Sequence, residues 1–255
     1  MARRCVFCGN AGLTREHVIP RWLTDVLPEQ ARFRGQDQMA VLLHPDHAVD
    51  GPHHREMPET FNSSTVKTVC GSCNNGFMND IETVTRPYLS TMIRGRLAMP
   101  LSVEAVTAVA TWAVKTSLMA QLTGSEPASI DRVYQDFYAT RRPTDACLVW
   151  AAAIDDEDWA LRAECRLMLY VLDGPPANGD DPPNLLTVAI GLGGLLLYTI
   201  IDPVLGPSTW NPTAVFRGAL VPLWPDPRPV TWPPSRVLRP AEAWGVCEYM
   251  PMLLG

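Results

Sequence analysis

The hydrophobic pattern predicts helices in the middle of the chain. From Asn74 onward, apolar residues recur at three- and four-residue spacing up to Gly95, which is typical of an amphipathic helix that ends at a glycine. A second helix is predicted from an N-cap at Ser102 to Leu122. Because apolar residues occupy most of its faces, we expect this helix to be central to a core. A third helix is predicted over residues 129–140.

Strands are predicted in the second half. Short apolar runs indicate strands at 147–154 and 166–172, and the run from Leu185 to Ile201 indicates two buried strands joined by a glycine turn. That run is shorter than the roughly 20 residues that a membrane helix needs. Residues 202–255 hold 11 of the 24 prolines, so we expect extended chain with edge strands there.

The first hundred residues differ from the rest and predict a separate domain. All five histidines and four of the seven cysteines lie in the first 73 residues. A short strand is predicted at 66–70, and residues 24–64, rich in Pro, His, Gly and Gln, are predicted to be a long irregular surface insertion. We therefore predict an N-terminal domain at 1–98 and a second domain at 99–255, with an overall α+β fold and a mainly antiparallel sheet in the second domain.

Composition and charge limit the function classes. With 255 residues, 47% of them hydrophobic, the chain can bury a sizeable core. The net charge of −6 argues against a broadly basic surface, although residues 1–100 carry +1 and residues 101–255 carry −7. The N-terminus lacks the apolar stretch of a secretory signal. We therefore expect a cytoplasmic protein with no membrane partner, in which paired cysteines more often bind metal than form disulfides.

Two C-x-x-C pairs predict a structural zinc site. Cys5 with Cys8 and Cys70 with Cys73 each offer two thiolates at the spacing of a zinc knuckle, and two such turns complete a tetrahedral site. The 61-residue gap between the pairs only has to loop out. The alternative is two unrelated pairs of buried cysteines. A thioredoxin-like role is disfavoured because no strand precedes Cys5 and no helix visibly begins there.

Such a zinc ion would hold Glu16 and His17 close to Asn74 and Asn75. Since adjacent strand residues face opposite ways, Glu16 can ligate a metal while His17 points to a substrate. Carboxylate and amide oxygens suit a hard cation, and a neutral histidine can take a proton from water. This combination is suited to hydrolysing a phosphodiester.

The order C-x-x-C-G, T-R-E-H-V-I-P and V-C-G-S-C-N-N-G-F-M resembles the zinc-knuckle form of the HNH (ββα-metal) endonucleases. The resemblance covers roughly the first 95 residues. It implies that Glu16 and Asn74 bind the catalytic divalent ion, Mg²⁺ or Mn²⁺, that His17 is the general base, and that duplex DNA is the substrate. Met78, four residues after Asn74, cannot ligate a hard ion.

Three further residues are candidates for substrate binding: Arg15, Asn75 and Arg86. Each has a simpler interpretation, because an asparagine near a helix start is often a cap and an arginine is often a solvated charge. Lys115, one turn from Trp112 in the central helix, is interpreted as a packing residue. The second domain is expected to recognise substrate, a partner or a second copy of the chain, which would give a homodimer.

Two other functions stay open at this point. One is a non-catalytic zinc module that binds nucleic acid or protein and keeps the motif as scaffold. The other is an enzyme that acts on RNA or a small nucleotide, which would need no broad basic surface. Steep salt dependence of binding would favour a duplex, because each neutralised phosphate releases counterions.

Overall fold

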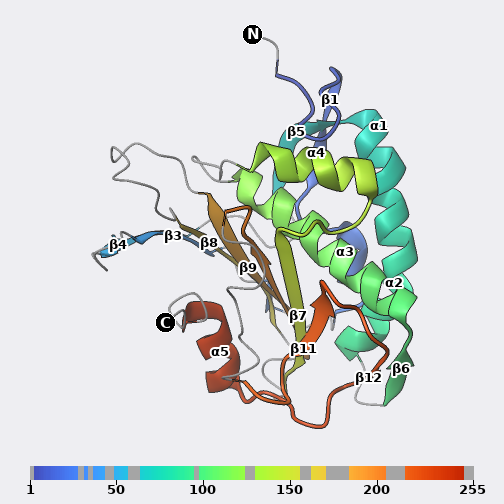
Figure 1. Cartoon of the computed structure of the whole chain (residues 1–255), viewed down its shortest axis with the longest axis vertical. Coiled ribbons are helices and arrows are strands. Elements are labelled where there is room, and N and C mark those ends of the chain that lie inside the picture. Colours follow the sequence, from blue (N-terminus) through green and yellow to red (C-terminus); the bar gives the residue numbers. More distant parts are fainter. Residues whose placement is uncertain are drawn as a thin grey trace.

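The computed structural model describes residues 3–27, 32–33, 37–43, 49–56, 64–94, 98–123, 130–155, 162–170, 184–204 and 216–249. Helices and largely antiparallel sheets are combined in one chain, which is an α+β architecture (Figure 1). The α+β class predicted from the sequence is therefore confirmed.

An eight-stranded sheet forms the centre, in the order β11-β7-β10-β9-β8-β3-β4, with β2 also paired to β8. All pairings are antiparallel except those of β8 with β2 and β3. The strands are β2 (Arg32–Phe33), β3 (Asp37–Leu43), β4 (Val49–Glu56), β7 (Cys147–Ala153), β8 (Arg162–Tyr170), β9 (Leu185–Leu192), β10 (Leu195–Ile201) and β11 (Val221–Trp224).

The predicted hairpin is confirmed as β9 and β10. Leu192 pairs with Leu195 across a two-residue turn, and Gly193 in that turn has a φ of 56°, a conformation that glycine adopts at little steric cost. Every residue of both strands except the turn is buried, because helices lie on both faces of this part of the sheet. The long apolar run is therefore explained by burial in the sheet, and no helix in the described part of the chain is long and apolar enough to cross a membrane.

Residues 24–64 contain strands that the sequence analysis predicted to be irregular. β2, β3 and β4 lie in this interval, and β3 pairs in parallel with β8, from Asp37 opposite Arg166 to Ala40 opposite Leu169. The partner strand is more than 100 residues away, so no local signal marks the pairing. Strands from both sides of residue 98 therefore share the central sheet.

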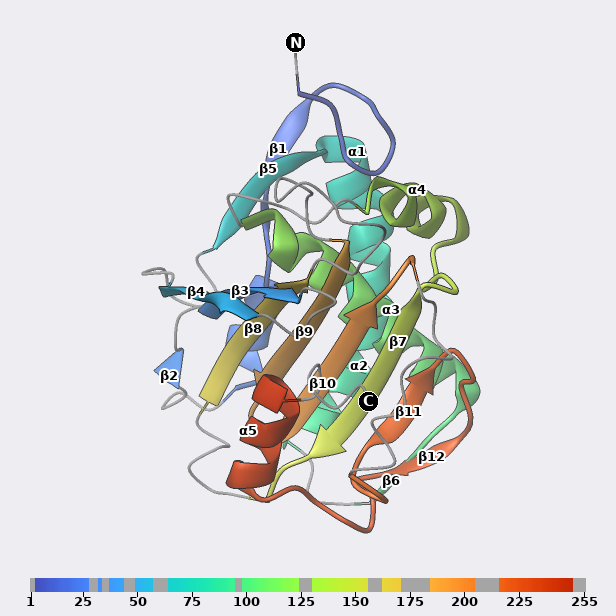
Figure 2. The same cartoon turned by 60° about the vertical axis from the view of Figure 1, so that its left-hand side comes forward.

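The helices lie on both faces of the sheet (Figures 1 and 2). α2, α3 and α4 cover one face, and α5 lies against β9 and β10 on the other. The helical elements are η1 (Arg21–Asp25), α1 (Gly71–Cys73), η2 (Asn74–Met78), α2 (Asn79–Arg94), α3 (Val103–Ala120), η3 (Gln121–Thr123), α4 (Asp131–Thr140) and α5 (Pro240–Tyr249). The three predicted helices are thus confirmed, and Ser102 caps α3 by accepting a hydrogen bond from the Ala105 N–H at 3.3 Å.

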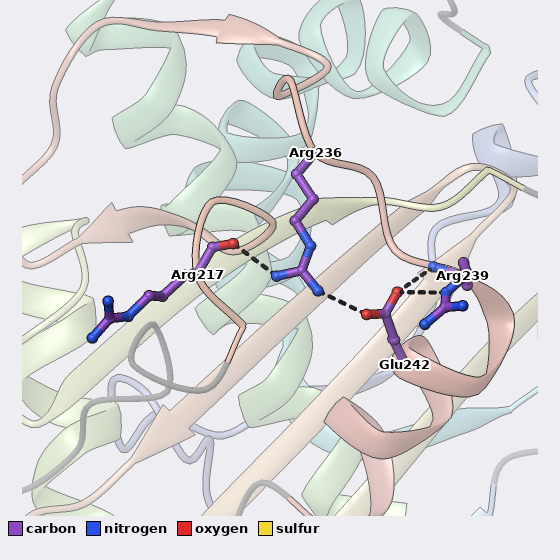
Figure 3. Close-up of polar contacts among 4 residues, drawn as sticks. All are labelled: Arg217, Arg236, Arg239 and Glu242. Atoms are coloured by element: carbon purple, nitrogen blue, oxygen red, sulfur yellow. Dashed lines mark hydrogen bonds and ion pairs between the residues drawn. The ribbon is translucent and has the colours of Figure 1, made fainter.

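Helix α5 corrects the prediction of extended chain after residue 202. Pro240 is its first residue, where a missing N–H is not needed, so proline starts this helix instead of excluding it. Glu242 fixes the first turn: its carboxylate accepts from the Arg239 N–H at 3.0 Å and pairs with the Arg236 guanidinium at 2.7 Å (Figure 3). Arg236 also donates to the Arg217 carbonyl at 2.7 Å, which ties the helix start to the preceding chain.

The N-terminal elements form two antiparallel strands followed by a helix. β1 (Leu13–His17) pairs with β5 (Thr65–Cys70), and α1, η2 and α2 follow directly. A second small sheet joins β6 (Met99–Leu101) to β12 (Val230–Trp232). One continuous cluster of buried side chains runs from the N-terminal loop through α3 to the sheet, so the strand-strand-helix unit is packed on the rest of the chain.

Candidate functional site

The four predicted zinc ligands meet in one cluster. The Sγ atoms of Cys5, Cys8, Cys70 and Cys73 all lie within 4.8 Å of one another, and none of the four forms a disulfide. Tetrahedral zinc with Zn–S bonds of about 2.3 Å places its sulfur ligands about 3.8 Å apart, so the cluster fits such an ion. Among the described residues this is the one group of three or more Cys, His, Asp or Glu side chains at such close spacing. These cysteines could therefore bind a metal ion such as zinc.

Two turns bring the cysteines together. Cys5 and Cys8 are on a tight loop closed by the Gly9 N–H donating to the Cys5 carbonyl at 2.9 Å, with Gly9 at a φ of 72°. Cys70 is the last residue of β5 and the N-cap of the single turn α1, and Cys73 is the last residue of α1. The loop is fixed to the strand because the Val6 N–H donates to the Thr68 carbonyl at 3.0 Å.

The thiols influence each other's ionisation. Burial and neighbouring thiols raise the pKa of Cys73 far above its usual value, and burial also raises the pKa of Cys8. Burial opposes ionisation of Cys70 as well, but hydrogen bonds from Ser72, the Cys73 backbone and adjacent thiols lower its pKa to about 6. A cation at the centre would favour the thiolate form of all four, since thiolates are the ligands that zinc prefers.

Phe7, between the first two cysteines, anchors the loop to the helices. Its ring is 2% exposed and lies edge-on to Phe77 of η2 at 5.2 Å and to Tyr134 of α4 at 5.4 Å. The Tyr134 hydroxyl in turn donates to the Leu118 carbonyl of α3 at 2.8 Å. Side chains from the second half of the chain therefore hold the Cys5–Cys8 loop in place.

Glu16 and His17 line a cavity of about 180 Å³ beside the cysteine cluster. The other residues that line it are Pro20, Arg21, Asn74, Asn75, Asn79 and Glu82. Glu16 and His17 thus share one cavity, although strand alternation predicted opposite directions. Both residues pair regularly with β5, Glu16 opposite Val66 and His17 opposite Thr65, and His17 is the last residue of β1, so the cavity lies at the end of this strand.

Asn74 connects the helix start to β1 at the edge of this cavity. Its Nδ2 atom lies 3.3 Å from Thr14 Oγ1 and 3.4 Å from the Arg15 carbonyl oxygen, and donates to both. Burial raises the pKa of Glu16 to about 7, although the Lys115 charge and a hydrogen bond from Asn74 oppose the rise and Glu82 adds to it. Near neutral pH, both the protonated and the ionised form of Glu16 are therefore populated, and a bound cation would favour the ionised carboxylate.

His17 is held as a neutral imidazole. Its Nε2 atom accepts a hydrogen bond from the Arg21 Nε at 3.1 Å, which requires an unprotonated nitrogen. Burial lowers the pKa of His17, the Arg21 charge lowers it further, and Glu82 opposes the shift. A neutral imidazole is the form that can take a proton.

The three predicted substrate-binding residues are placed differently from one another. Asn75 lines the cavity and is exposed. Arg15 is exposed on β1 and contributes its carbonyl to Asn74. Arg86 lies one turn beyond Glu82 and forms an ion pair with Asp25 at 3.3 Å while its guanidinium stacks over Trp22.

Sequence reasoning missed three residues of this region: Arg21, Glu82 and Lys115. Arg21 had a signal, because it follows Pro20 and falls four residues after His17. Glu82 also had one, since it is three residues after Asn79 and so shares its helix face. Lys115 was interpreted as packing, yet its Nζ atom lies 2.6 Å from the Glu82 Oε1 atom, and only the contact between α2 and α3 makes this visible.

A larger cavity of about 590 Å³ lies on the other side of α2, against α3 and the end of α4. No residue predicted from the sequence to carry chemistry lines it. Compared with family models, with curated proteins and with solved structures, the chain matches none. Function is therefore inferred from the chemistry of the residues around Glu16 and His17.

Proposed function

We propose that the chain is a metal-dependent endonuclease of the HNH (ββα-metal) type that hydrolyses phosphodiester bonds in DNA. In this proposal His17 is the general base and Glu16 and Asn74 hold one divalent ion, Mg²⁺ or Mn²⁺. The four cysteines hold a structural zinc ion. The observation that carries the proposal is the common cavity of Glu16, His17 and Asn74 directly beside the cysteine cluster.

The oxygen-rich lining supports a hard cation. Glu16 and Glu82 offer carboxylates, and Asn74, Asn75 and Asn79 offer amide oxygens, which are the ligands that Mg²⁺ and Mn²⁺ accept. The ligand atoms of Glu16, His17 and Glu82 are farther apart than the sulfur atoms of the cysteine cluster, which all lie within 4.8 Å of one another. This spacing leaves room for water, which Mg²⁺ keeps in most protein sites. When bound, the ion supplies charge stabilisation at the phosphate and at the leaving oxygen.

The residues of the chain supply the other steps. His17 takes a proton from a water molecule as the water oxygen forms a bond to phosphorus, and the bond from phosphorus to the sugar oxygen breaks. The leaving oxygen takes a proton from solvent. Arg21 is exposed at the rim of the cavity, so its guanidinium can transfer from His17 to a substrate phosphate, which orients the phosphate and frees Nε2 in the same movement.

The test is plasmid nicking and cleavage with Mg²⁺ or Mn²⁺ by the wild type, His17→Ala and a control, His44→Ala, which removes a histidine not assigned to the site. We expect cutting by the wild type and the control, and a loss of at least about 100-fold in His17→Ala. Zinc content and circular dichroism are measured for all three proteins. Equal cutting by wild type and His17→Ala would contradict the assigned base.

The same three proteins are also used to determine the substrate class. Duplex DNA, single-stranded DNA, RNA and cyclic dinucleotides are supplied in parallel, because the net charge of −6 gives the chain no broad basic surface for a duplex. If only RNA or only a small nucleotide is cut, that molecule is the substrate in place of DNA, and the roles of the residues stay the same. Absence of cutting by a folded, zinc-loaded wild type on every substrate would favour a non-catalytic zinc module that binds nucleic acid or protein.

A further inference from the structure

Lys115 is a fully buried charged residue on the central helix. It lies in α3, in which 14 of the 18 residues are buried, and its side chain is 0% exposed. Burying an ammonium group is unfavourable by several kcal/mol in general unless a partner compensates. The partner is Glu82 of α2, whose Oε1 atom lies 2.6 Å from Nζ and whose side chain is 18% exposed.

Structural stability alone gives a weak reason for this pair. Replacing a buried ion pair by apolar side chains of similar size is often neutral or stabilising, and most of the buried residues of α3 are apolar. A methionine or leucine at this position would continue the buried surface of the helix. The pair is therefore better explained by where Glu82 lies than by the free energy of folding.

Glu82 faces the cavity that contains Glu16 and His17. It lines this cavity together with Asn74 and Asn79, from one helix face, while Lys115 approaches from behind it on α3. Lys115 is bonded to Oε1, and Oε2 is the remaining oxygen that can face the cavity. Lys115 also acts on Glu16, because its charge opposes the rise in the pKa of that carboxyl that burial causes.

We propose that Glu82 is a further oxygen ligand of the divalent ion and that Lys115 is the positioning residue that holds the Glu82 carboxylate toward it. This inference rests on the proposed function, since it adds to the same cation site. Met78 cannot ligate a hard ion, and Glu82, on the next turn of the helix beyond Asn79, supplies a further carboxylate. A residue of the second half of the chain thereby becomes part of the site.

Charge balance supports this arrangement. Two carboxylates that share one small cavity repel each other, as the effect of Glu82 on Glu16 indicates. A fixed positive charge beside them reduces this repulsion in the absence of the ion, and the Lys115 ammonium lies 2.6 Å from Glu82 in a position that solvent does not reach. A divalent ion held by Glu16 and Glu82 would add positive charge from the cavity that both carboxylates line.

The experiment measures Mn²⁺ binding by electron paramagnetic resonance, with zinc already bound and no DNA present. Wild type, Glu82→Gln, Lys115→Met, Lys115→Arg and the control Lys67→Met are compared. Lys67 is an exposed lysine of β5, so its substitution makes the same change of charge away from the cavity. We expect Mn²⁺ affinity to fall at least tenfold in Glu82→Gln and Lys115→Met, to fall less in Lys115→Arg, and to be unchanged in Lys67→Met.

The outcomes distinguish failure of the roles of Glu82 and Lys115 from failure of the cation site itself. Mn²⁺ binding within twofold of wild type by folded Glu82→Gln would overturn the inference, even if melting shows that the ion pair stabilises the fold. Failure of the wild type to bind Mn²⁺ would instead overturn the cation site of the proposed function. If Lys115→Met does not fold, the Mn²⁺ affinities of Lys115→Arg and Glu82→Gln test the inference. In the first variant a guanidinium still faces the Glu82 carboxylate, and in the second an amide still faces the Lys115 ammonium.

Discussion

The Nε atom of Arg21 donates a hydrogen bond to the Nε2 atom of His17 at 3.1 Å. Three residues separate them, and the last of these, Pro20, directly precedes the short helix η1 that begins at Arg21, so the chain turns the arginine back toward the histidine. An arginine in this place keeps the imidazole neutral and stands at the mouth of the cavity. Under the proposed function, this arginine would link the ionisation of the base to the binding of a substrate phosphate.

Replacing Arg21 by methionine is expected to raise the pKa of His17, because a positive charge that disfavours the imidazolium is removed while burial still lowers the pKa. Two-dimensional NMR titration of the histidine signals measures the change. In cleavage assays we expect KM for DNA to rise about tenfold, the loss of one charge-assisted hydrogen bond. Arg132→Gln, on the exposed surface of α4, is the control, and an unchanged His17 titration in Arg21→Met would contradict the assigned contact.

In the protein without the divalent ion, Glu16 is expected to lower the free energy of unfolding as pH rises. Its pKa is about 7 in the folded chain against an ordinary value of 4.5, so between these two pH values the unfolded chain has lost a proton that the folded chain keeps. The free energy of unfolding therefore falls with rising pH across this window. Glu16→Gln should remove this decrease, and chemical denaturation of both proteins at pH 4.5, 6 and 8 measures the difference.

The comparison with Glu16→Gln isolates this carboxyl from His17. The lowered pKa of His17 acts in the opposite direction, since the folded chain then binds fewer protons than the unfolded chain below the ordinary histidine value. Added Mn²⁺ should restore stability of the wild type at pH 8 and leave Glu16→Gln unchanged. A wild type whose stability parallels that of the variant at all three pH values would refute the raised pKa.

Cys73→Ser is expected to lose zinc and destabilise the N-terminal unit. Removing one of four thiolates opens a cluster that joins the first loop to α1. We expect the zinc content to fall below half of one ion per chain and the melting temperature to fall by about 6–12 °C, as for a loss of ~3 kcal/mol in a chain of this size. Zinc is quantified by mass spectrometry of the purified protein.

Cys147→Ala is the matched control for that measurement. Cys147 is a fully buried cysteine of β7 that lies outside the four-cysteine cluster and contacts Thr144. Its substitution creates a small cavity without removing a ligand, so zinc content should stay at the wild-type level. Equal zinc content in Cys73→Ser and Cys147→Ala would mean that the cluster is not the metal site.

Local pattern determined the helices α2, α3 and α4, the buried hairpin and the cysteine cluster. Helical spacing after Asn74 and the N-cap at Ser102 act within a few residues, and two C-x-x-C turns can close on one ion whatever separates them. The Glu16-His17 pair was equally visible, because its chemistry depends on residue type and on nearness to the cluster. These features can be predicted from short stretches of sequence without knowledge of distant contacts.

Tertiary structure alone decided the pairing of β3 with β8, and the role of Lys115. The strand pairing joins segments more than 100 residues apart, so its hydrogen bonds leave no mark on either segment by itself. Lys115 appears in sequence as one polar residue on an apolar helix, and only the packing of α3 on α2 brings its ammonium to Glu82. The physical reason is common to both cases: the free energy of a buried hydrogen bond or ion pair depends on the partner that folding supplies.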